Sequence, residues 1–329
     1  MLKRLFLPII FICLVVVGLV GYIWFHRNLL AVSSSDQTQE FLITKGTGAI
    51  KTATNLEKAG LIRNALVFRI YMKISGAEGR IQAGQYDLSP SMSTAEIIKQ
   101  LLLGPNEVWV TIPEGMRKEE IGEKFILSFG LKDQKAIDFR SEFRSLTKDK
   151  EGYLFPDTYL FEKTTTATKV VNYLTNTFTT KTKGLDTDYE TIIVASLLER
   201  ETFTDEEKPT VVAIIYKRLD AGWPLQIDAA VQYAVTNSKL NNSNTVILDE
   251  YWKELTKADI DISSPYNTYK RTGLPPTPIA NPGLASLKAA INKQMETDYY
   301  FYLHDSKGQI HYAKTLEEHN ANVRKYLNK

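Results

Sequence analysis

The sequence predicts a mixed α+β protein that carries a single transmembrane helix at its N-terminus. Three observations predict this class: an uncharged apolar run at residues 5–25, an alternation of strand and helix patterns over residues 40–112, and mostly helical periodicity after residue 113. The 329 residues suffice for two or three domains, and a composition with 43% hydrophobic and 24% charged residues is that of an ordinary globular protein.

Charge and cysteine content exclude several classes of protein. Forty Lys and Arg against 38 Asp and Glu leave a net charge of +2, so affinity resting on phosphate neutralisation is excluded and we expect no nucleic-acid partner. The single cysteine, Cys13, lies within the apolar run. The rest of the chain therefore has neither a disulfide framework nor a cysteine-cluster metal site.

The apolar run at residues 5–25 contains no charge and reaches about 30 Å as a helix, one hydrocarbon thickness. Lys3 and Arg4 precede it, so we expect residues 1–4 to form a cytoplasmic tail and everything after the span to lie outside. A cleaved signal peptide ending near Ala31-Val32-Ser33 is the alternative. The length of the run favours the uncleaved anchor, because a signal peptide needs only ~7–15 apolar residues.

Downstream of the span, residues 26–39 are polar and Ser-rich, which is typical of a linker. The α+β module follows, with strands expected at 40–44, 82–88 and 107–112 and helices at 50–59, 64–74 and 94–103.

Residues 113–185 read as a mostly helical connecting region, interrupted by an ordered aromatic loop at 151–159. The last region, 186–329, begins with strong helix signals at 189–202 and 209–220. It continues with a loop or insertion at 235–247, a polar stretch at 261–283, a helix at 284–295, strands at 299–303 and 310–313, and a closing helix at 315–327.

One carboxylate stands out in the helix at 189–202. With Val194 at zero on a helical wheel, Glu201 falls at about 340°, inside the apolar stripe, whereas Glu199 falls at about 140°. A carboxyl group covered by an apolar face keeps its proton to higher pH and can donate it. A glutamate pointing to solvent from a frayed helix end is the alternative interpretation.

The remaining chemical inventory is small. The four histidines, His26, His304, His311 and His319, show no metal-ligand spacing, and no serine-nucleophile motif occurs, so we expect no metal and no cofactor. Carboxylates, tyrosines and amides remain. That set suits acid–base work on a sugar bond or a purely binding role.

Several segments, in order along the chain, carry a family resemblance. They are 113–116 (PEGM), 152–159 (GYLFPDTY), 195–202 (ASLLERET), 225–228 (LQID) with Tyr233 downstream, 264–269 (SPYNTY), 273–276 (GLPP), 279–283 (IANPG) and 286–290 (SLKAA). Together they make the chain similar to the endolytic murein transglycosylases, the MltG or YceG-like proteins. The resemblance implies a LysM-like module at 40–112 and a lysozyme-like catalytic domain at 186–329.

The resemblance also implies the chemistry. The family's catalytic glutamate maps to Glu201, and the activity would be cleavage of the β-1,4 bond between N-acetylmuramic acid and N-acetylglucosamine with formation of 1,6-anhydro ends. The candidate substrate-binding residues are Gln226, Asp228, Tyr266, Asn267, Thr268 and Tyr269. The chain departs from the family at 227–230 (IDAA, where TDPT is frequent) and at Thr277, where Gly is frequent.

Two other functions stay open at this level: a lysozyme-like hydrolase with Asp228 as the second carboxylate, and a non-catalytic glycan-binding scaffold. The resemblance implies peptidoglycan strands as substrate, penicillin-binding proteins and other wall-synthesis enzymes as partners, and a bacterial cytoplasmic membrane location with the catalytic domain outside.

Overall fold

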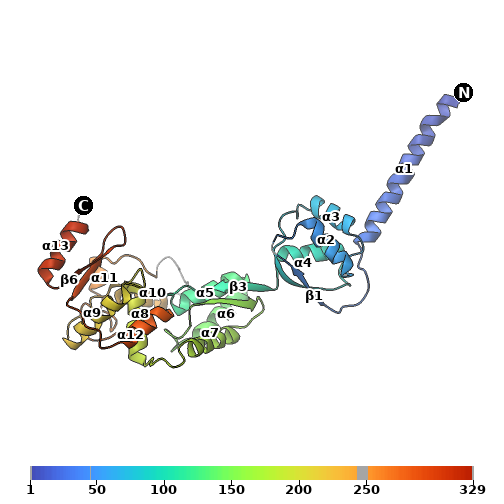
Figure 1. The fold of residues 1–329 in the computed structure, drawn as a ribbon. Coiled ribbons are helices and arrows are strands. Elements are labelled where there is room, and N and C mark those ends of the chain that lie inside the picture. The colour runs from blue at the N-terminus through green and yellow to red at the C-terminus, as the bar shows by residue number, and fades with distance from the viewer. Residues whose placement is uncertain (1, 45, 243–250, 328–329) are drawn as a thin grey trace. The chain divides into compact units, whose positions relative to one another are not determined.

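The computed structural model describes residues 2–44, 46–242 and 251–327 and divides into two compact units (Figure 1). The first unit comprises Met1–Val108 with Phe161–Thr164, and the second comprises Trp109–Leu160 with Thr165–Lys329. The fold is mixed α+β with an apolar N-terminal helix, which confirms the predicted class.

Helix α1 (Leu2–Leu29) covers the predicted span and continues beyond it, so residues 26–29 are helical rather than part of the linker. Its segment Ile12–Leu29 has a mean hydropathy of 1.6 and is, within the part of the chain that the structure describes, the one helix long and apolar enough to cross a membrane. Length and composition admit either an anchor or a signal sequence.

The first unit contains a two-stranded antiparallel sheet, β1 (Gln39–Ile43) and β2 (Gly84–Leu88), in which Phe41 lies opposite Tyr86. Both side chains are buried and pack on three helices: α2 (Ala49–Lys58), α3 (Ala65–Ile74) and α4 (Thr94–Leu103). The predicted N-cap of α4 is present, because Ser93 and Glu96 form a reciprocal capping box.

A second two-stranded sheet joins β3 (Glu107–Thr111) to β4 (Thr158–Glu162). The expectation of a loop followed by helical chain was wrong for β4. Tyr159 and Phe161 are buried while the residues between and beside them are not, which is the two-residue period of a strand. This alternation spans only five residues, too short to stand out against the surrounding helical pattern.

The core of the second unit is helical (Figure 1), and α8 (Tyr189–Glu201) packs against three of its neighbours, α9, α10 and α12. All eight residues from Thr191 to Leu198 are buried. The other helices of this unit that precede the terminal hairpin are α5 (Lys118–Phe129), α6 (Asp133–Leu146), α7 (Ala167–Lys181), α9 (Lys208–Asp220), α10 (Asp228–Asn242), the short α11 (Lys257–Ile260) and α12 (Leu284–Ile291).

Helix α10 corrects the loop expected at residues 235–247. Residues 235–242 are helical, and residues 243–247 lie outside the described part of the chain. The Asn- and Ser-rich composition favoured a loop, but Ala230 and Tyr233 anchor the preceding turns in the core and the helix continues from there.

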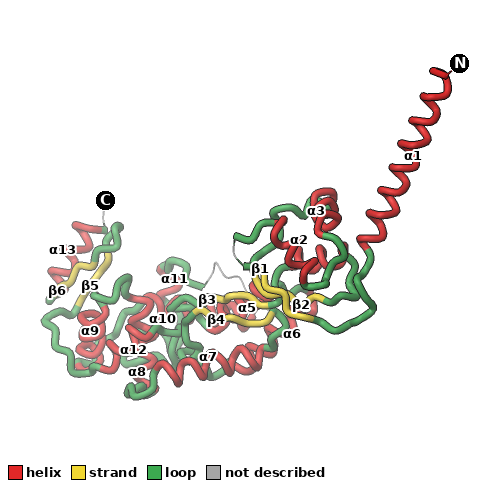
Figure 2. Tube along the Cα trace, turned by 45° about the vertical axis from the view of Figure 1, so that its right-hand side comes forward, coloured by secondary structure: helices red, strands yellow, loops and turns green. Residues whose placement is uncertain are grey.

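The chain ends with a hairpin of β5 (Phe301–His304) and β6 (Ile310–Ala313), followed by α13 (Leu316–Tyr326), which packs on both strands (Figure 2). These elements agree with the two strands and the closing helix predicted from the sequence. The hairpin matters for function because it brings Tyr302 to the end of α8.

Candidate functional site

Helix α8 ends at Glu201 because Thr202 leaves the helical conformation, with φ −119° and ψ 143°. The Thr202 hydroxyl donates to the carbonyl of Leu198 at 2.8 Å, and the Thr202 backbone N–H donates to the same carbonyl at 3.2 Å. The glutamate therefore occupies the final helical position, next to a chain reversal, and lines an open cleft.

This cleft, which we call the Glu201 cleft, has a volume of about 480 Å³. Its walls come from α8, α9, the segment before α10, the loop before residue 270, and the terminal hairpin with α13. The polar residues that line it are Glu201, Arg218, Gln226, Asp228, Tyr269, Tyr302, His304 and His319.

The surroundings of Glu201 favour the protonated form of its carboxyl group. Burial raises its pKa to about 7, and the charge of Asp228 pushes in the same direction. A hydrogen bond from the Tyr302 hydroxyl to Oε2, at 2.6 Å, favours the charged form and opposes the rise. Burial also raises the pKa of Tyr302 well above its usual value, so this hydroxyl remains a donor.

Arg218 holds two walls of the cleft together. Its Nε donates to the carbonyl of Tyr300 and its Nη1 to the carbonyl of Leu225, both at 2.8 Å. The start of β5 is thereby tied to the chain that leads into α10. Arg218 is 8% exposed, and the positive charge of its guanidinium favours ionised Glu201.

Asp228 and Gln226 are fixed on the opposite wall. The Tyr269 hydroxyl donates to Asp228 Oδ1 at 2.6 Å. Gln226 adopts a φ of +55°, and its backbone N–H donates to the carbonyl of Thr268 at 3.0 Å. A positive φ is uncommon for a residue with a side chain and is maintained here by the surrounding contacts.

The six candidate substrate-binding residues occupy three environments. Gln226, Asp228 and Tyr269 line the Glu201 cleft. Asn267 and Thr268 are buried, and their side chains bond to backbone groups of the same region: Asn267 Nδ2 donates to the carbonyls of Ile260 and Ile262. Tyr266 lines a different cavity and donates its hydroxyl to Thr277 at 2.9 Å or accepts from it.

Three cleft residues had no sequence signal. The sequence places Tyr302 and Arg218 only in a strand and a helix, and it favours a surface or structurally satisfied role for His304. Tyr302 is 101 residues from Glu201, and no local spacing connects the two. His304 Nε2 lies 3.2 Å from Glu207 Oε2, on the chain segment that follows α8.

Glu199 is also covered, although the helical wheel placed it away from the apolar stripe. Its Oε2 accepts from the backbone N–H of Gly283 at 2.8 Å, at the N-terminus of α12, and Lys208 Nζ lies 3.7 Å from Oε1. A Cβ at Gly283 would meet Glu114 Oε1 at 1.7 Å, so any other residue there would require the Glu114 carboxyl to move. Since α8 is buried on all sides, an apolar stripe does not distinguish Glu201; the open cleft does.

Within residues 2–44, 46–242 and 251–327, no three histidine, cysteine, aspartate or glutamate side chains are grouped so that they could hold a metal ion. The groups that line the Glu201 cleft can donate and accept protons and hydrogen bonds.

A carboxyl group that titrates near neutrality at the end of a central helix, in a cleft lined with tyrosines and amides, is typical of proteins that carry out general acid–base chemistry. Comparison with known sequences identifies the family of this chain. The profile of the YceG-like family matches residues 41–325, and the chain belongs to that family.

Two curated relatives are named endolytic murein transglycosylase. The Bacillus subtilis (strain 168) protein is 30% identical over 341 residues, which cover 93% of this chain and 90% of the relative. The protein of Streptococcus pneumoniae serotype 2 is 29% identical over 356 residues and 94% of this chain, and this chain spans 62% of its length.

A solved structure is also similar. The crystal structure of a yceG-like protein from Listeria monocytogenes matches with a TM-score of 0.52 and 28% identity. The match covers 87% of this chain and 99% of that protein.

Proposed function

We propose that this protein is a membrane-anchored endolytic lytic transglycosylase that cuts the β-1,4 bond between N-acetylmuramic acid and N-acetylglucosamine in peptidoglycan strands. The observation that carries the proposal is Glu201, a carboxyl with a pKa of about 7 in an open cleft. The family membership and the relatives' name support the same reaction.

In the proposed mechanism Glu201 acts twice. Its protonated form donates to the glycosidic oxygen as the bond to C1 of the muramyl residue breaks. The resulting carboxylate then takes the proton from the C6 hydroxyl of the same sugar, whose oxygen attacks C1. A 1,6-anhydro ring forms, Glu201 regains its proton, and no water is consumed.

The other residues of the cleft position the Glu201 carboxyl and the sugars, and they stabilise the transition state. The Tyr302 hydroxyl orients the Glu201 carboxyl through Oε2, which leaves Oε1 as the oxygen that meets the substrate. Asp228, held by Tyr269, supplies a negative charge that favours an oxocarbenium-like state. Gln226 offers an amide to the N-acetyl and hydroxyl groups of the sugars.

The rest of the chain is assigned by the same proposal. Helix α1 would anchor the protein in a bacterial cytoplasmic membrane with the N-terminus inside, and residues 40–112 would serve as a LysM-like module that binds glycan. Residues 113–185 would connect this module to a lysozyme-like catalytic region at 186–329. Penicillin-binding proteins and other wall-synthesis enzymes are the proposed partners.

Mass spectrometry of the products tests the reaction. Purified full-length protein in detergent is incubated with uncrosslinked peptidoglycan strands, and 1,6-anhydromuramyl ends are the expected product. Reducing muramyl ends would instead indicate a hydrolase that uses Asp228 as its second carboxylate, a candidate kept open because Asp228 shares the cleft with Glu201. Binding of strands without any cutting would indicate a scaffold.

A further inference from the structure

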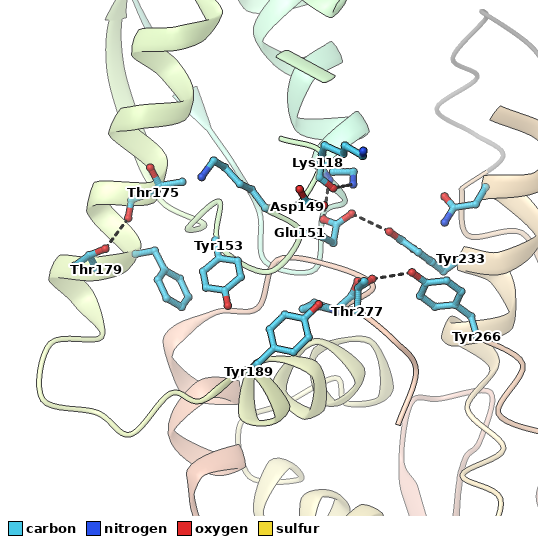
Figure 3. Close-up of a pocket in the computed structure, with 15 residues that line it drawn as sticks. Lys118, Asp149, Glu151, Tyr153, Thr175, Thr179, Tyr189, Tyr233, Tyr266 and Thr277 are labelled. Carbon is cyan, nitrogen blue, oxygen red and sulfur yellow. Dashed lines mark hydrogen bonds between the residues drawn. The ribbon is translucent and has the colours of Figure 1, made fainter. Parts of the chain in front are cut away.

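The second unit contains another cavity, of about 520 Å³, which the proposed chemistry does not use (Figure 3). We call it the Glu151 cavity. Four tyrosines from separate segments line it: Tyr153, Tyr189, Tyr233 and Tyr266. A volume of this size lies within the range of small-ligand pockets, roughly 300–1,000 Å³.

Glu151 is a buried carboxyl, 4% exposed, at the wall of this cavity. Its Oε1 accepts two hydrogen bonds, from the backbone N–H of Lys118 at 2.9 Å and from Asn281 Nδ2 at 2.8 Å. Its Oε2 has the hydroxyl of Tyr233 at 3.4 Å, a long contact (Figure 3). Oε1 is therefore held by two short hydrogen bonds, whereas Oε2 accepts, among the residues that the structure describes, only one long hydrogen bond, from the Tyr233 hydroxyl.

Protonation of Glu151 makes its Oε2 a hydrogen-bond donor. Burial raises its pKa to about 8, with a further rise from the charge of Glu119, while Lys118 and Arg117 act in the opposite direction. At neutral pH the group carries its proton, and the two N–H bonds to Oε1 leave Oε2 as the protonated oxygen. A protonated carboxyl in a cavity can donate to a carboxylate or carbonyl of a ligand.

The charges around the cavity favour an anion. Lys118, Lys148 and Lys150 line it together with a single other acid, Asp149. With Glu151 neutral, three positive charges face one negative charge. Tyr189 is 47% exposed, so its ring can cover an aliphatic group of a ligand while the lysines meet its charge.

The cavity and the Glu201 cleft are served by one stretch of chain. Tyr266 lines the cavity and Tyr269 lines the cleft. Because the two residues are three positions apart, their Cα atoms are separated by at most about 11 Å. Helix α8 also links the two sites: it begins at Tyr189, which lines the cavity, and ends at Glu201, about 18 Å away along the helix axis. A side branch of about five or six extended residues spans this distance.

We propose that the Glu151 cavity binds the carboxylate-bearing peptide that branches from the sugar strand, and so positions a peptide-substituted strand against Glu201. This inference rests on the proposed function for its choice of ligand. The carboxylate would meet the lysines and the Glu151 proton, and the tyrosine rings would cover the aliphatic side chains.

Direct binding tests the proposal without catalysis. The probe is the dipeptide acetyl-L-Ala-γ-D-Glu with both carboxylates free, titrated into full-length Glu201→Gln protein in detergent and followed by calorimetry. We expect binding of this dipeptide and at least about tenfold weaker binding of its diamide, the loss expected for a charge-assisted contact. Equal affinities, or displacement of the dipeptide by chitotetraose, which has no carboxylate, would overturn the proposal.

Matched variants locate the site. Lys148→Ala combined with Lys150→Ala should weaken the dipeptide about tenfold. The control is Lys183→Ala combined with Lys288→Ala, which removes the same charge from exposed positions of the same unit that do not line the cavity. Equal loss in both pairs would mean a nonspecific charge effect and would sink the proposal.

A pH titration separates ligand contact from a scaffold role of Glu151. The charged or titratable groups that face it are Arg117, Lys118 and Glu119 from the start of α5, and Tyr233 from α10. Binding should weaken as the pH rises through about 8, because ionised Glu151 repels the ligand. Glu151→Gln should bind at pH 7 and lose this dependence; a dependence that persists in Glu151→Gln contradicts the inference.

The two proposals fail separately. Wild-type protein that cuts strands but does not bind the dipeptide leaves the proposed function intact and removes the peptide site. Protein that binds the dipeptide but never forms anhydro ends keeps the site and removes the transglycosylase.

Discussion

Glu201, which is half-buried, and Glu151, which is buried, are carboxyls of the second unit, and desolvation raises the pKa of each, to about 7 and about 8. Their surroundings differ. The two N–H donors on one oxygen of Glu151 hold loop 148–153 to α5 and to the chain before α12, whereas Glu201 accepts from a tyrosine hydroxyl at the edge of a cleft. Desolvation is the largest cause of the raised pKa in both carboxyls, and the hydrogen-bond partners of each oxygen decide between a structural and a reactive role.

Glu201→Gln should have the largest effect. Loss of the proton donor should lower the cutting rate by about 10²–10⁴-fold, measured as anhydro ends formed per minute. Glutamine keeps the shape and can still accept from Tyr302. Cutting at an unchanged rate would contradict the role of Glu201 as the acid.

The pH dependence of the stability of Glu201→Gln tests whether Glu201 is desolvated. A carboxyl whose folded pKa lies above its unfolded value of 4.5 costs nothing below about pH 4.5 and reaches its full cost above about pH 7. Glu201→Gln should therefore be more stable than wild type at pH 8, by up to about 3 kcal/mol, and similar at pH 4. Urea unfolding at both pH values measures the difference, and equal stability at pH 8 would show that Glu201 is not desolvated.

Glu151→Ala should have the next largest effect, and mainly on stability. The substitution leaves the backbone N–H of Lys118 without its acceptor and removes one of the two acceptors of the Asn281 amide, which keeps its bond to the carbonyl of Met116. We expect a loss of about 2–4 kcal/mol in the free energy of unfolding at pH 6. Glu151→Gln keeps an oxygen acceptor and should lose less. A loss below about 1 kcal/mol for alanine would place Glu151 outside the scaffold.

Tyr302→Phe should reduce cutting by about tenfold, because the Glu201 carboxyl loses the bond that orients it. The hydroxyl favours the charged form, so its removal should raise the pKa of Glu201 further and shift the alkaline limb of the pH–rate profile upward. An alkaline limb that moves to lower pH or does not move would contradict this positioning role, whatever the cutting rate of the variant.

Asp228→Asn should have the smallest effect, a few-fold change in rate. Its negative charge helps raise the pKa of Glu201, so the alkaline limb should move to lower pH in the variant. A loss of about 10³-fold instead would identify Asp228 as a second essential carboxylate and favour the hydrolase.

Local patterns were sufficient for much of the fold. The apolar run, the helix at 189–202 and the terminal hairpin are each specified by periodicity within a short window, and all three are present. Strand β4 differs from the prediction because its alternation spans only five residues, and the turns at 235–242 are helical because contacts of the preceding turns with the core outweigh a loop-like composition.

The candidate site also has features that the sequence predicts and features that it does not. The position of Glu201 at the end of a helix follows from the sequence, since the apolar period and Thr202 lie beside it. The sequence could not tell that α8 is buried on every side or that Asn267 and Thr268 belong to the frame of their loop. Burial of a side chain depends on which elements surround it, and those elements are distant in the chain.

The sequence by itself determined the apolar first helix, the order of most elements and the acidic residue at the end of α8. Only the tertiary structure decided that Tyr302 and Arg218 would flank this residue and that Glu151 would keep a proton. The physical reason is the distance along the chain over which each effect acts. Helical and strand periods act over a few residues, whereas desolvation and hydrogen bonding depend on segments that meet only when the chain has folded.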